Sequence, residues 1–519
     1  MYGAWWLLIA AFGALHALHL RADFPNHSPW IFDWAKYTDE GWYGNAAVRA
    51  HLYGSWYMPG DFNPAAAVPV WPFLEWVLFF FTGVTVQAAR GLAVAFFFLN
   101  LLLSYLLLRT RGPRWMAMLA LTLLVTSPFL YCFSRLAILE PLLTACTLGA
   151  LNLAVRLDKM RRPTAGAAWI GFLFTLMMLT KTTAVFLLPA LGWAMLAPIW
   201  KVRGSALKCA LTAAGTFALC FGAWMAVIAK LGLMTDYKYL FVVNKYVKPA
   251  QFYWPVLSLW WSLHGVLWAD RILTPLAGLV VLGAVISLLA QRTGWGRELL
   301  KNPVSGASLL AIAGYILFMT YQNHPQPRYY AIVAFFCFFL AAMGTETLLR
   351  QADWQRHLGW IAAGGAVVAV AINAAWTLNF ARHPEYSFVD AAERLTKYID
   401  THANGKRLLV SISGDEITLM THLPTICDDF GTQDLASKLA AYQPGWYATW
   451  NEFDPGTLED IHTHFSVEQV EGFRAFDDPE RDVLVLFRLH PLPNGEVRSP
   501  EDQPLNVALP GDRIEIPVE

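Results

Sequence analysis

Three carboxylates in the first third of the sequence are of the type and spacing that acid–base chemistry requires. Asp39 and Glu40 are adjacent in the segment YTDEGWYGNAA, and Glu140 follows in the segment SRLAILEP. A carboxylate within hydrogen-bonding distance of a hydroxyl can take its proton while a new bond forms, and this assistance is worth about 10²–10⁴-fold in rate. We therefore predict Asp39 as a general base, with Glu140 and Glu40 as supporting acids that orient an acceptor group.

Four nitrogen-bearing side chains occur in similar surroundings, beside long apolar runs. Lys181 lies in LTKTT and Arg135 lies in SRLAILEP. His324 and Arg328 both lie in NHPQPRYY. A Lys or Arg can neutralise the charge on a phosphate, and Arg does so through two parallel hydrogen bonds. The pattern indicates a site for an anionic headgroup, with Arg328 and Lys181 as its main binding residues.

Each of these residues also has a purely structural interpretation. Adjacent Asp and Glu residues suit the first turn of a helix, where they complement the helix dipole. Glu140 can pair with Arg135 before it, and Lys181 can extend its amine along apolar surface to water. Arg328 can contact lipid phosphates without specificity, because it stands at the start of an apolar run. His324, alone in a connector, is expected to be structural.

The elements that must position these side chains are membrane helices. Of the 519 residues, 56% are hydrophobic and 15% are charged, whereas a typical soluble domain has about 25% charged residues. This composition excludes a disordered chain and an ordinary cytosolic enzyme. Eleven runs reach the roughly 20 apolar residues that a crossing helix needs. They lie at about 4–20, 86–109, 114–133, 136–156, 165–180, 182–200, 205–231, 271–291, 304–321, 328–349 and 357–380.

A shorter apolar run, 68–82, contains Pro69, Pro72 and Glu75, and we expect it to lie at the membrane interface or to be re-entrant. With this assignment five basic connectors fall on one face of the membrane. The positive-inside rule makes that face the cytoplasmic one. The connectors are 109–114, 156–162, 201–208, 291–301 and 350–356.

The same rule orients the rest of the chain in a bacterial inner membrane. The N-terminus lacks a basic region and a small-residue cleavage site, which favours a retained first span with a cytoplasmic start. The loops 21–85 and 232–270 and the segment 383–519 are then periplasmic, and all candidate site residues reach the outer membrane edge. Ionisable groups there are costly and usually face an interior cavity. Tyr329 and Tyr330 are predicted to belong to the aromatic belt at the interface.

The charge distribution divides the chain into two parts. Residues 1–382 contain 28 basic and 13 acidic residues and form the predicted membrane domain, whereas residues 383–519 contain 10 basic and 25 acidic residues. The second part alternates helical and strand-like runs, which predicts a small α/β domain with a loosely ordered tail at 491–519. The pair Asp415 and Glu416 is expected on its surface. The predicted elements are helices at 388–401 and 434–442 and strands at 407–413, 445–450 and 483–489.

Several other functions lack a sequence signature. The chain contains no G-x-x-x-x-G-K-[ST], G-x-G-x-x-G or H-E-x-x-H motif, so a nucleotide-driven pump or a zincin has no support. Its net charge is zero and its polar part is acidic, which argues against nucleic-acid binding. The six Cys residues form no CxxC pair or Cys/His cluster. We therefore expect no certain cofactor, and the sequence does not support a divalent metal.

The order of the short motifs resembles that of GT-C glycosyltransferases. An Asp-Glu pair in the first outer loop is followed by an R-x-x-x-x-[DE]-P-like element, by LTK between two spans, and by PRYY before a late span. QAAR at 87–90 adds a further match before the second full span. The likeness covers most of residues 1–382 and is strongest to the branch with protein O-mannosyltransferases and the bacterial aminoarabinose–lipid A transferases.

This resemblance implies an α-helical polytopic protein with about 11–13 membrane helices, juxtamembrane helices in the first loop and a C-terminal extracytoplasmic α/β domain. It implies transfer of a sugar from a polyprenyl-phosphate donor to a lipid, glycan or protein on the outer face, in a bilayer whose lipids are also partners. Asp39 and Glu140 match the two acidic positions, and Lys181 and Arg328 match the phosphate-binding positions. The first loop departs from the transferase pattern, because 61–69 reads DFNPAAAVP and lacks the Glu-Lys-Pro element. Lipid A is therefore not implied as the acceptor.

Two other classes remain as alternatives. A lipid flippase or secondary transporter requires ionisable residues in the middle of its spans, where this chain has few polar residues, namely Asn100, Ser104 and Asn152. A sensor would use the outer domain as its receptor, but eleven spans are far more than an anchor needs. An enzyme fits the polar residues gathered at the outer edge better than either alternative.

Overall fold

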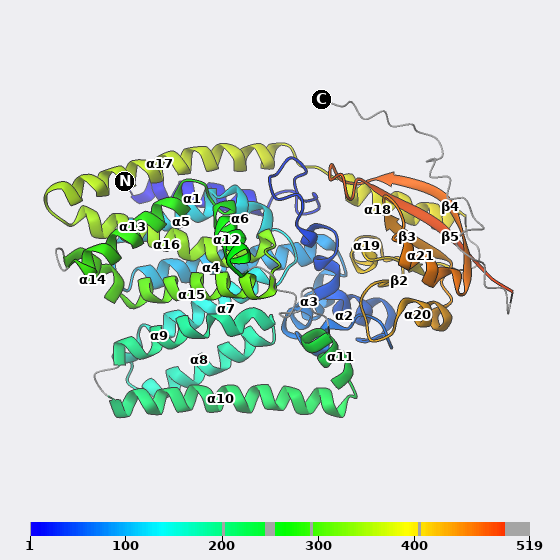
Figure 1. Ribbon diagram of the computed structural model, residues 1–519, viewed down its shortest axis with the longest axis horizontal. Helices are drawn as coiled ribbons and strands as arrows, with labels where there is room; N and C mark the ends of the chain where they lie inside the picture. The colour runs from blue at the N-terminus through cyan, green and yellow to red at the C-terminus, as the bar shows by residue number, and fades with distance from the viewer. Residues whose placement is uncertain (1, 200–202, 244–254, 291–293, 403–405, 494–519) are drawn as a thin grey trace.

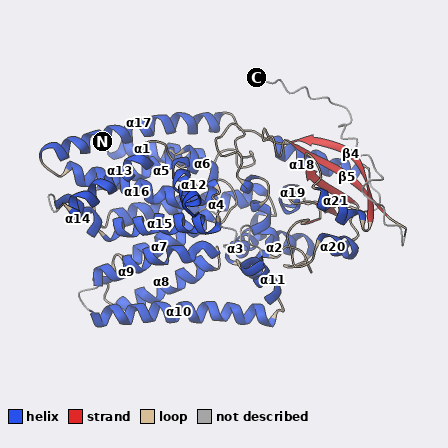
Figure 2. Ribbon diagram, viewed as in Figure 1, coloured by secondary structure: helices blue, strands red, loops and turns tan. Residues whose placement is uncertain are grey.

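A helical bundle and a small α/β domain make up the two ends of the molecule (Figure 1; Figure 2). The computed structural model describes residues 2–199, 203–243, 255–290, 294–402 and 406–493. The predicted tail at 491–519 falls outside the described residues from position 494 onward. The helices of the bundle are α1 (Tyr2–His16), α4 (Val86–Leu108), α5 (Arg114–Thr126), α6 (Pro128–Phe133), α7 (Glu140–Ala154), α8 (Pro163–Met178), α9 (Leu188–Ile199), α10 (Arg203–Lys230), α13 (Leu273–Leu289), α15 (Pro303–Gln322), α16 (Tyr330–Leu349) and α17 (Asp353–Arg382).

The chain is a multi-pass membrane protein. All eleven predicted runs are mainly helical, but within the described residues six helices are long and apolar enough to cross a membrane by themselves. A seventh span is obtained if α13 is joined to the preceding α12 (Pro255–Gly265) across a 118° bend. The six are Val86–Leu108, Thr182–Ile199, Ser205–Lys230, Pro303–Gln322, Pro327–Leu349 and Trp354–Thr401.

Proline explains why some predicted spans are shorter than expected. The run 114–133 is broken into α5 and α6 because Pro128 lacks a backbone N–H and disfavours helical backbone at Ser127. Ser127 has ψ 116° and its hydroxyl accepts a hydrogen bond from the Leu130 N–H at 3.2 Å, which caps α6. The run 136–156 becomes helical only at Glu140, where Pro141 occupies the first turn of α7.

The first long connection, residues 21–85, is folded between the bundle and the α/β domain. It contains the 3₁₀ turn Trp34–Lys36, α2 (Asp39–Tyr53) and α3 (Val70–Thr82), which packs against α2. With 13 residues, α3 is roughly 20 Å long, less than the hydrocarbon core of about 30 Å. The connection after α10 adds α11 (Met234–Lys238) and the π-helical turn Tyr239–Val243.

The α/β domain is built on a five-stranded sheet in the order β2-β1-β3-β5-β4. β1 pairs in parallel with β2 and β3, whereas β5 is antiparallel to β3 and β4. Helices α18 and α20 and strands β3 and β5 confirm four of the predicted elements. The elements are α18 (Ser387–Thr401), β1 (Leu409–Val410), α19 (Gly414–Thr421), β2 (Thr425–Ile426), α20 (Leu435–Tyr442), β3 (Trp446–Trp450), α21 (Pro455–His462), β4 (Phe465–Arg474) and β5 (Val483–Pro491).

One prediction for this domain needs correction, and one long strand was missed. The predicted strand 407–413 pairs only at Leu409–Val410, because the chain turns into α19 at Gly414. β4 was not predicted, since most of its side chains are only half buried and its sequence, FSVEQVEGFR, lacks a clear apolar–polar alternation.

Candidate functional site

Asp39 is the first residue of helix α2, in the connection between α1 and α4. The Thr38 hydroxyl donates to the Trp34 carbonyl at 3.0 Å and to Asp39 Oδ1 at 3.3 Å, which holds the start of the helix in place. The Asp39 side chain is 3% exposed, and the acidic first turn complements the helix dipole. The carboxylate is therefore presented in a buried, fixed position.

Arg328 lies between two acids from this loop. Its Nε is 2.9 Å from Asp39 Oδ2, and its Nη1 donates to Asp33 Oδ1 at 2.7 Å. The Arg328 backbone N–H also donates to Asp33 Oδ2 at 2.7 Å. Asp33 therefore fixes both the backbone and the guanidinium of Arg328, at the point where the connector enters α16.

A second buried ion pair lies nearby. Lys181, just before a 3₁₀ turn that leads into α9, pairs with Glu140 at the start of α7. Its Nζ is 4.5 Å from the ring centroid of Tyr329, and the Arg328 guanidinium is 4.8 Å from the same ring. One aromatic ring thus contacts both cations and sets their spacing.

These groups surround a cavity of about 190 Å³. Asp39, Lys181, Arg328 and His324 all contribute to its wall, so four of the seven predicted site residues meet there. Glu140 is not part of the lining, but it pairs with Lys181, which is. The rest of the lining is largely aromatic or aliphatic and comprises Trp42, Tyr43, Phe62, Val68, Leu139, Thr182, Thr183, Leu240, Phe241, Phe318, Gln322 and Tyr329.

Burial changes the proton affinity of two groups at this cavity. Desolvation raises the pKa of Asp39, against the opposing effect of the charges on Arg328 and Lys181. A raised pKa makes the carboxylate a better proton acceptor. Desolvation, reinforced by Arg328, lowers the pKa of His324 to about 4, so its ring is neutral near pH 7. The ring packs edge-on against Trp34, with 5.5 Å between centroids.

Glu40 and Arg135 lie away from the cavity wall. Glu40 forms a bidentate pair with Arg90 of α4, at 2.8 and 2.6 Å, and accepts the Ala137 N–H at 2.7 Å. Arg135 donates to the carbonyls of Leu18 and His19 at 2.6 and 2.7 Å. The first contact fixes α2 to the bundle, and the second secures the end of the first helix. The pairing of Glu140 with Arg135 that the sequence suggested is therefore wrong, because Glu140 pairs with Lys181 and Arg135 donates to backbone carbonyls.

Asp415 and Glu416 are buried, which corrects the expectation that they lie on the surface. They begin α19, which packs against α2 rather than facing water. Glu416 Oε2 accepts the Gly41 N–H at 2.7 Å, and burial together with the Glu40 charge raises the pKa of Glu416 well above its usual range. A Cβ at Gly41 would lie 2.1 Å from the Glu416 backbone nitrogen, so only glycine permits this approach.

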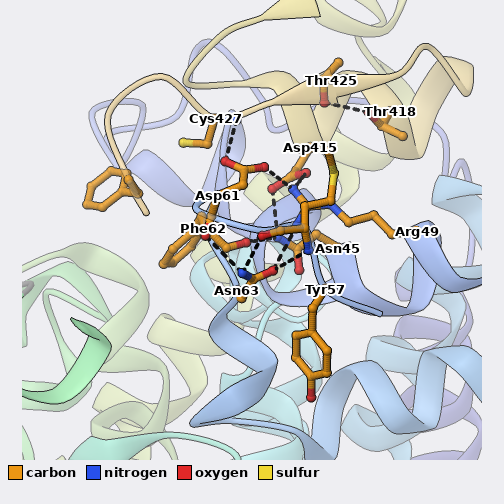
Figure 3. A network of polar contacts seen from close by, with 12 residues as sticks. Asn45, Arg49, Tyr57, Asp61, Phe62, Asn63, Asp415, Thr418, Thr425 and Cys427 are labelled. Carbon is orange, nitrogen blue, oxygen red and sulfur yellow. Dashed lines mark hydrogen bonds and ion pairs between the residues drawn. The ribbon is translucent and has the colours of Figure 1, made fainter. Parts of the chain in front are cut away.

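A sealed polar network continues this contact (Figure 3). Arg49 of α2 donates to Asp61 at 2.7 Å and to Asp415 at 3.0 Å, while Asn45 donates to Asp415 at 2.9 Å. Lys438 of α20 lies 3.3 Å from Asp61 and donates to the Cys427 carbonyl at 2.7 Å. The helix that carries Asp39 is therefore held by the α/β domain on its other side.

The structure adds residues that sequence reasoning missed. Asp33 was passed over, although an isolated acid within the aromatic segment PWIFDWA is a detectable signal. Tyr329 and Tyr330 were assigned to the aromatic belt, but Tyr329 lines the cavity and Tyr330 is buried with its hydroxyl 2.8 Å from the Ser262 carbonyl. The Pro-Arg-Tyr-Tyr turn points both rings into the protein.

The acids at this cavity contact cations rather than one another. The described residues contain no group of three or more His, Cys, Asp or Glu side chains arranged to hold one. The three acids near the cavity contact two cations, since Asp33 and Asp39 share Arg328 and Glu140 pairs with Lys181.

Comparison with known proteins identifies the fold. No protein-family model matches the chain, and no curated protein matches its sequence. ArnT from Cupriavidus metallidurans bound to undecaprenyl phosphate matches with a TM-score of 0.62, at 12% identity, over 94% of this chain and 98% of that one. The oligosaccharyltransferase AglB from Archaeoglobus fulgidus, with an inhibitory peptide and a dolichol-phosphate, matches with a TM-score of 0.50, at 13% identity, over 97% and 75%.

The class of protein follows from these matches. The chain is a helical membrane protein with a C-terminal mixed α/β domain, and it has the GT-C fold. The fold expected from the order of the sequence motifs is thereby confirmed.

Proposed function

We propose that this protein is an integral-membrane glycosyltransferase that uses a polyprenyl-phosphate sugar as donor. The observation that supports this most directly is the meeting of Asp39, Arg328 and Lys181 at one cavity. Two cations suit a lipid phosphate, and a buried carboxylate suits an acceptor hydroxyl. Similarity to two folds that hold undecaprenyl phosphate and a dolichol-phosphate supports the same donor class.

The donor phosphate is bound by Arg328 and Lys181. Asp33 holds Arg328 through its backbone and one guanidinium nitrogen, which leaves Nε and Nη2 directed toward Asp39 and Tyr329. These two nitrogens exchange their contacts for phosphate oxygens when the donor enters. The polyprenyl phosphate leaves as an anion, and the two cations stabilise the charge that develops on it.

Asp39 acts as the general base. The acceptor oxygen attacks the anomeric carbon, the bond from that carbon to the phosphate oxygen breaks, and the acceptor proton passes to Asp39. A single displacement of this kind inverts the anomeric centre. Glu140 keeps Lys181 in position, and Glu40 keeps α2 fixed through Arg90.

The cavity opens on the outer face of a bacterial inner membrane in this proposal. The N-terminus is cytoplasmic, and the α/β domain is periplasmic beside the acceptor, which is a lipid, a glycan or a protein. The positive-inside rule supports this orientation, because it makes the face with the basic connectors the cytoplasmic one.

The mid-span polar residues Asn100, Ser104 and Asn152 do not favour the transporter alternative. Asn100 donates to the Pro141 carbonyl at 2.9 Å, and Asn152 donates to the Leu103 carbonyl at 2.9 Å. Ser104 donates to the carbonyl of Asn100 at 2.6 Å. These three mid-span residues thus donate to backbone carbonyls, whereas a translocation route needs groups that face water or substrate.

The test uses purified protein in detergent, radiolabelled polyprenyl-phosphate sugars and a membrane extract as the acceptor pool. Wild type should transfer label to a new product, and Asp39→Asn should not. Asp400→Asn serves as the matched control, because Asp400 lies in an exposed ion pair with Arg407. Failure of folded wild type to transfer label from any donor would contradict the proposal and direct the work to a liposome translocation assay.

A further inference from the structure

A second charged cavity lies at the end of the bundle away from the α/β domain. It has a volume of about 460 Å³ and lies between the α4–α5 connector, α14 (Gly294–Lys301) and the start of α15. Figure 1 places α14 at that end, beside the turn from α16 into α17. Since spanning helices begin and end there, the cavity lies at the depth of lipid headgroups.

Cations dominate the wall of this cavity. Arg111 comes from the α4–α5 connector, and Arg297 and Lys301 come from α14, whereas Glu298 is the only acid in the lining. The lining ends at Asn302 and Pro303, where the positive end of the α15 dipole adds to the potential. The cavity is therefore complementary to an anion.

Several other cations near this end are already occupied. Arg114 lies over the ring of Tyr2 at 4.8 Å, Arg156 donates to the Asn152 carbonyl at 2.6 Å, and Arg350 pairs with Glu346. These contacts leave little charge available for a ligand.

The cations that line the cavity are less completely paired with other residues. Neither Arg297 nor Lys301 forms an ion pair with any described residue. The buried Arg111 Nε has no hydrogen-bond partner in the described part of the chain, while Nη2 of the same side chain donates to the Val155 carbonyl at 3.2 Å. The guanidinium is thus anchored at one nitrogen and has an unsatisfied N–H at another.

Helix α14 is held rigidly enough to form such a site. Its residues Trp295, Gly296 and Leu299 are buried, whereas Arg297 and Glu298 are exposed. A Cβ at Gly296 would lie 2.3 Å from the Ala284 carbonyl oxygen, so α14 packs directly on the backbone of α13. The helix thus lies across the bundle with its charged side directed outward.

We propose that this cavity binds the headgroup of an acidic membrane lipid, with phosphatidylglycerol as the probe. Basic pockets between membrane helices recognise such headgroups, and each cation near the surface contributes to the attraction. The position at helix ends favours a lipid over a soluble phosphate, because the bilayer itself supplies the ligand at high local concentration. The site is separate from the Asp39 cavity, and its occupancy is measured without any enzyme assay.

The test counts lipids retained by the full-length protein in neutral detergent by native mass spectrometry, with phosphatidylglycerol titrated against phosphatidylcholine. Wild type should retain phosphatidylglycerol in preference. The double variant Arg297→Gln/Lys301→Gln should bind it about 30-fold more weakly, from the loss of two cations. Arg161→Gln/Arg162→Gln is the matched control, because these exposed cations belong to another connector at the same end.

Three results would overturn the proposal. They are equal retention of both lipids by wild type, unchanged binding in the double variant, and a loss in the control as large as in the double variant. Displacement of phosphatidylglycerol by an excess of soluble glycerol phosphate would show a site for small phosphates and would equally reject a lipid site. Equal melting temperatures of all proteins establish that a loss of binding is not a loss of folding.

Discussion

Helix α2 carries buried charge on two sides, and the two clusters differ in how completely they are paired. On one side Asp39, with Asp33 and Glu140, meets two cations at the wall of a cavity. On the other side two cations, Arg49 and Lys438, meet two acids, Asp61 and Asp415. In the second cluster the charges balance, and all four side chains are at most 3% exposed.

This difference in pairing distinguishes a cluster suited to binding a ligand from a cluster that positions a helix. A buried charge that lacks a full set of partners is costly unless a ligand or a proton completes it. The cluster at the cavity has one acid more than it has cations, and burial raises the pKa of its Asp39. Burial also raises the pKa of Asp415 in the other cluster, so the count of charges and not the pKa shift separates the two. The sealed cluster instead fixes the orientation of α2 against the α/β domain.

The largest expected effect is the loss of catalysis in Asp39→Asn. Removal of a general base should lower turnover by about 10²–10⁴-fold. The melting temperature should stay close to that of wild type, because Asn preserves the volume of the side chain and can still contact Arg328. Turnover is measured with the radiolabelled donor. Near-normal turnover would remove Asp39 from the mechanism and leave the cavity cluster no more functional than the sealed one.

Arg49→Ala should act on stability instead. It leaves Asp61 and Asp415 without their shared cation, and breaking a buried pair in this way costs about 3–5 kcal/mol. The free energy of unfolding is measured by titration with a denaturing detergent. Arg407→Ala removes the same residue type from an exposed pair and should cost about 1 kcal/mol or less. Equal costs in the two variants would mean that the network of Figure 3 does not hold α2.

Arg328→Lys should weaken donor use without unfolding the protein. Lysine keeps the charge but loses the planar fork, and a charge-assisted hydrogen bond is worth about 1.5–3 kcal/mol. We therefore expect kcat/KM for the donor to fall roughly 10–100-fold. Arg382→Lys, at the exposed outer end of α17, is the control and should leave it unchanged. An unaffected kcat/KM in Arg328→Lys would argue against a bidentate phosphate contact.

The smallest effect expected is a shift in the acid limb of the pH profile. A general base must be deprotonated, so kcat/KM rises with pH through the pKa of Asp39 in the free enzyme. Because burial raises that pKa, the midpoint should lie above the value of about 3.9 for an ordinary Asp. The measurement is kcat/KM against pH. A midpoint at or below the ordinary value would contradict the raised pKa.

Much of the fold was predictable from local signals in the sequence. Apolar runs of spanning length marked the helices of the bundle, because the bilayer requires about 20 apolar residues per crossing. In the α/β domain, α18 and β5 followed from clear periodicity. β4 and α19 were not predicted, because a half-buried strand and a short helix produce only weak hydrophobic periodicity in the sequence.

The candidate site was predictable only in part. Asp39, Lys181 and Arg328 were selected because each is an ionisable residue at the edge of an apolar run, and all three line one cavity. Glu40 satisfied the same criterion, but its carboxylate turns toward Arg90. Adjacent residues on a helix point about 100° apart, and sequence alone does not say which direction meets the cavity.

Composition and order along the chain determined that this protein is a multi-pass membrane protein with an acidic C-terminal domain, because hydrophobic length and charge are properties of each segment alone. The tertiary structure determined which charged side chains pair with one another. Arg328 found Asp33 almost three hundred residues away, and Asp415 met Arg49 across the boundary between bundle and α/β domain. A buried ion pair depends on distance and solvent exclusion, and both arise only when separate segments pack together.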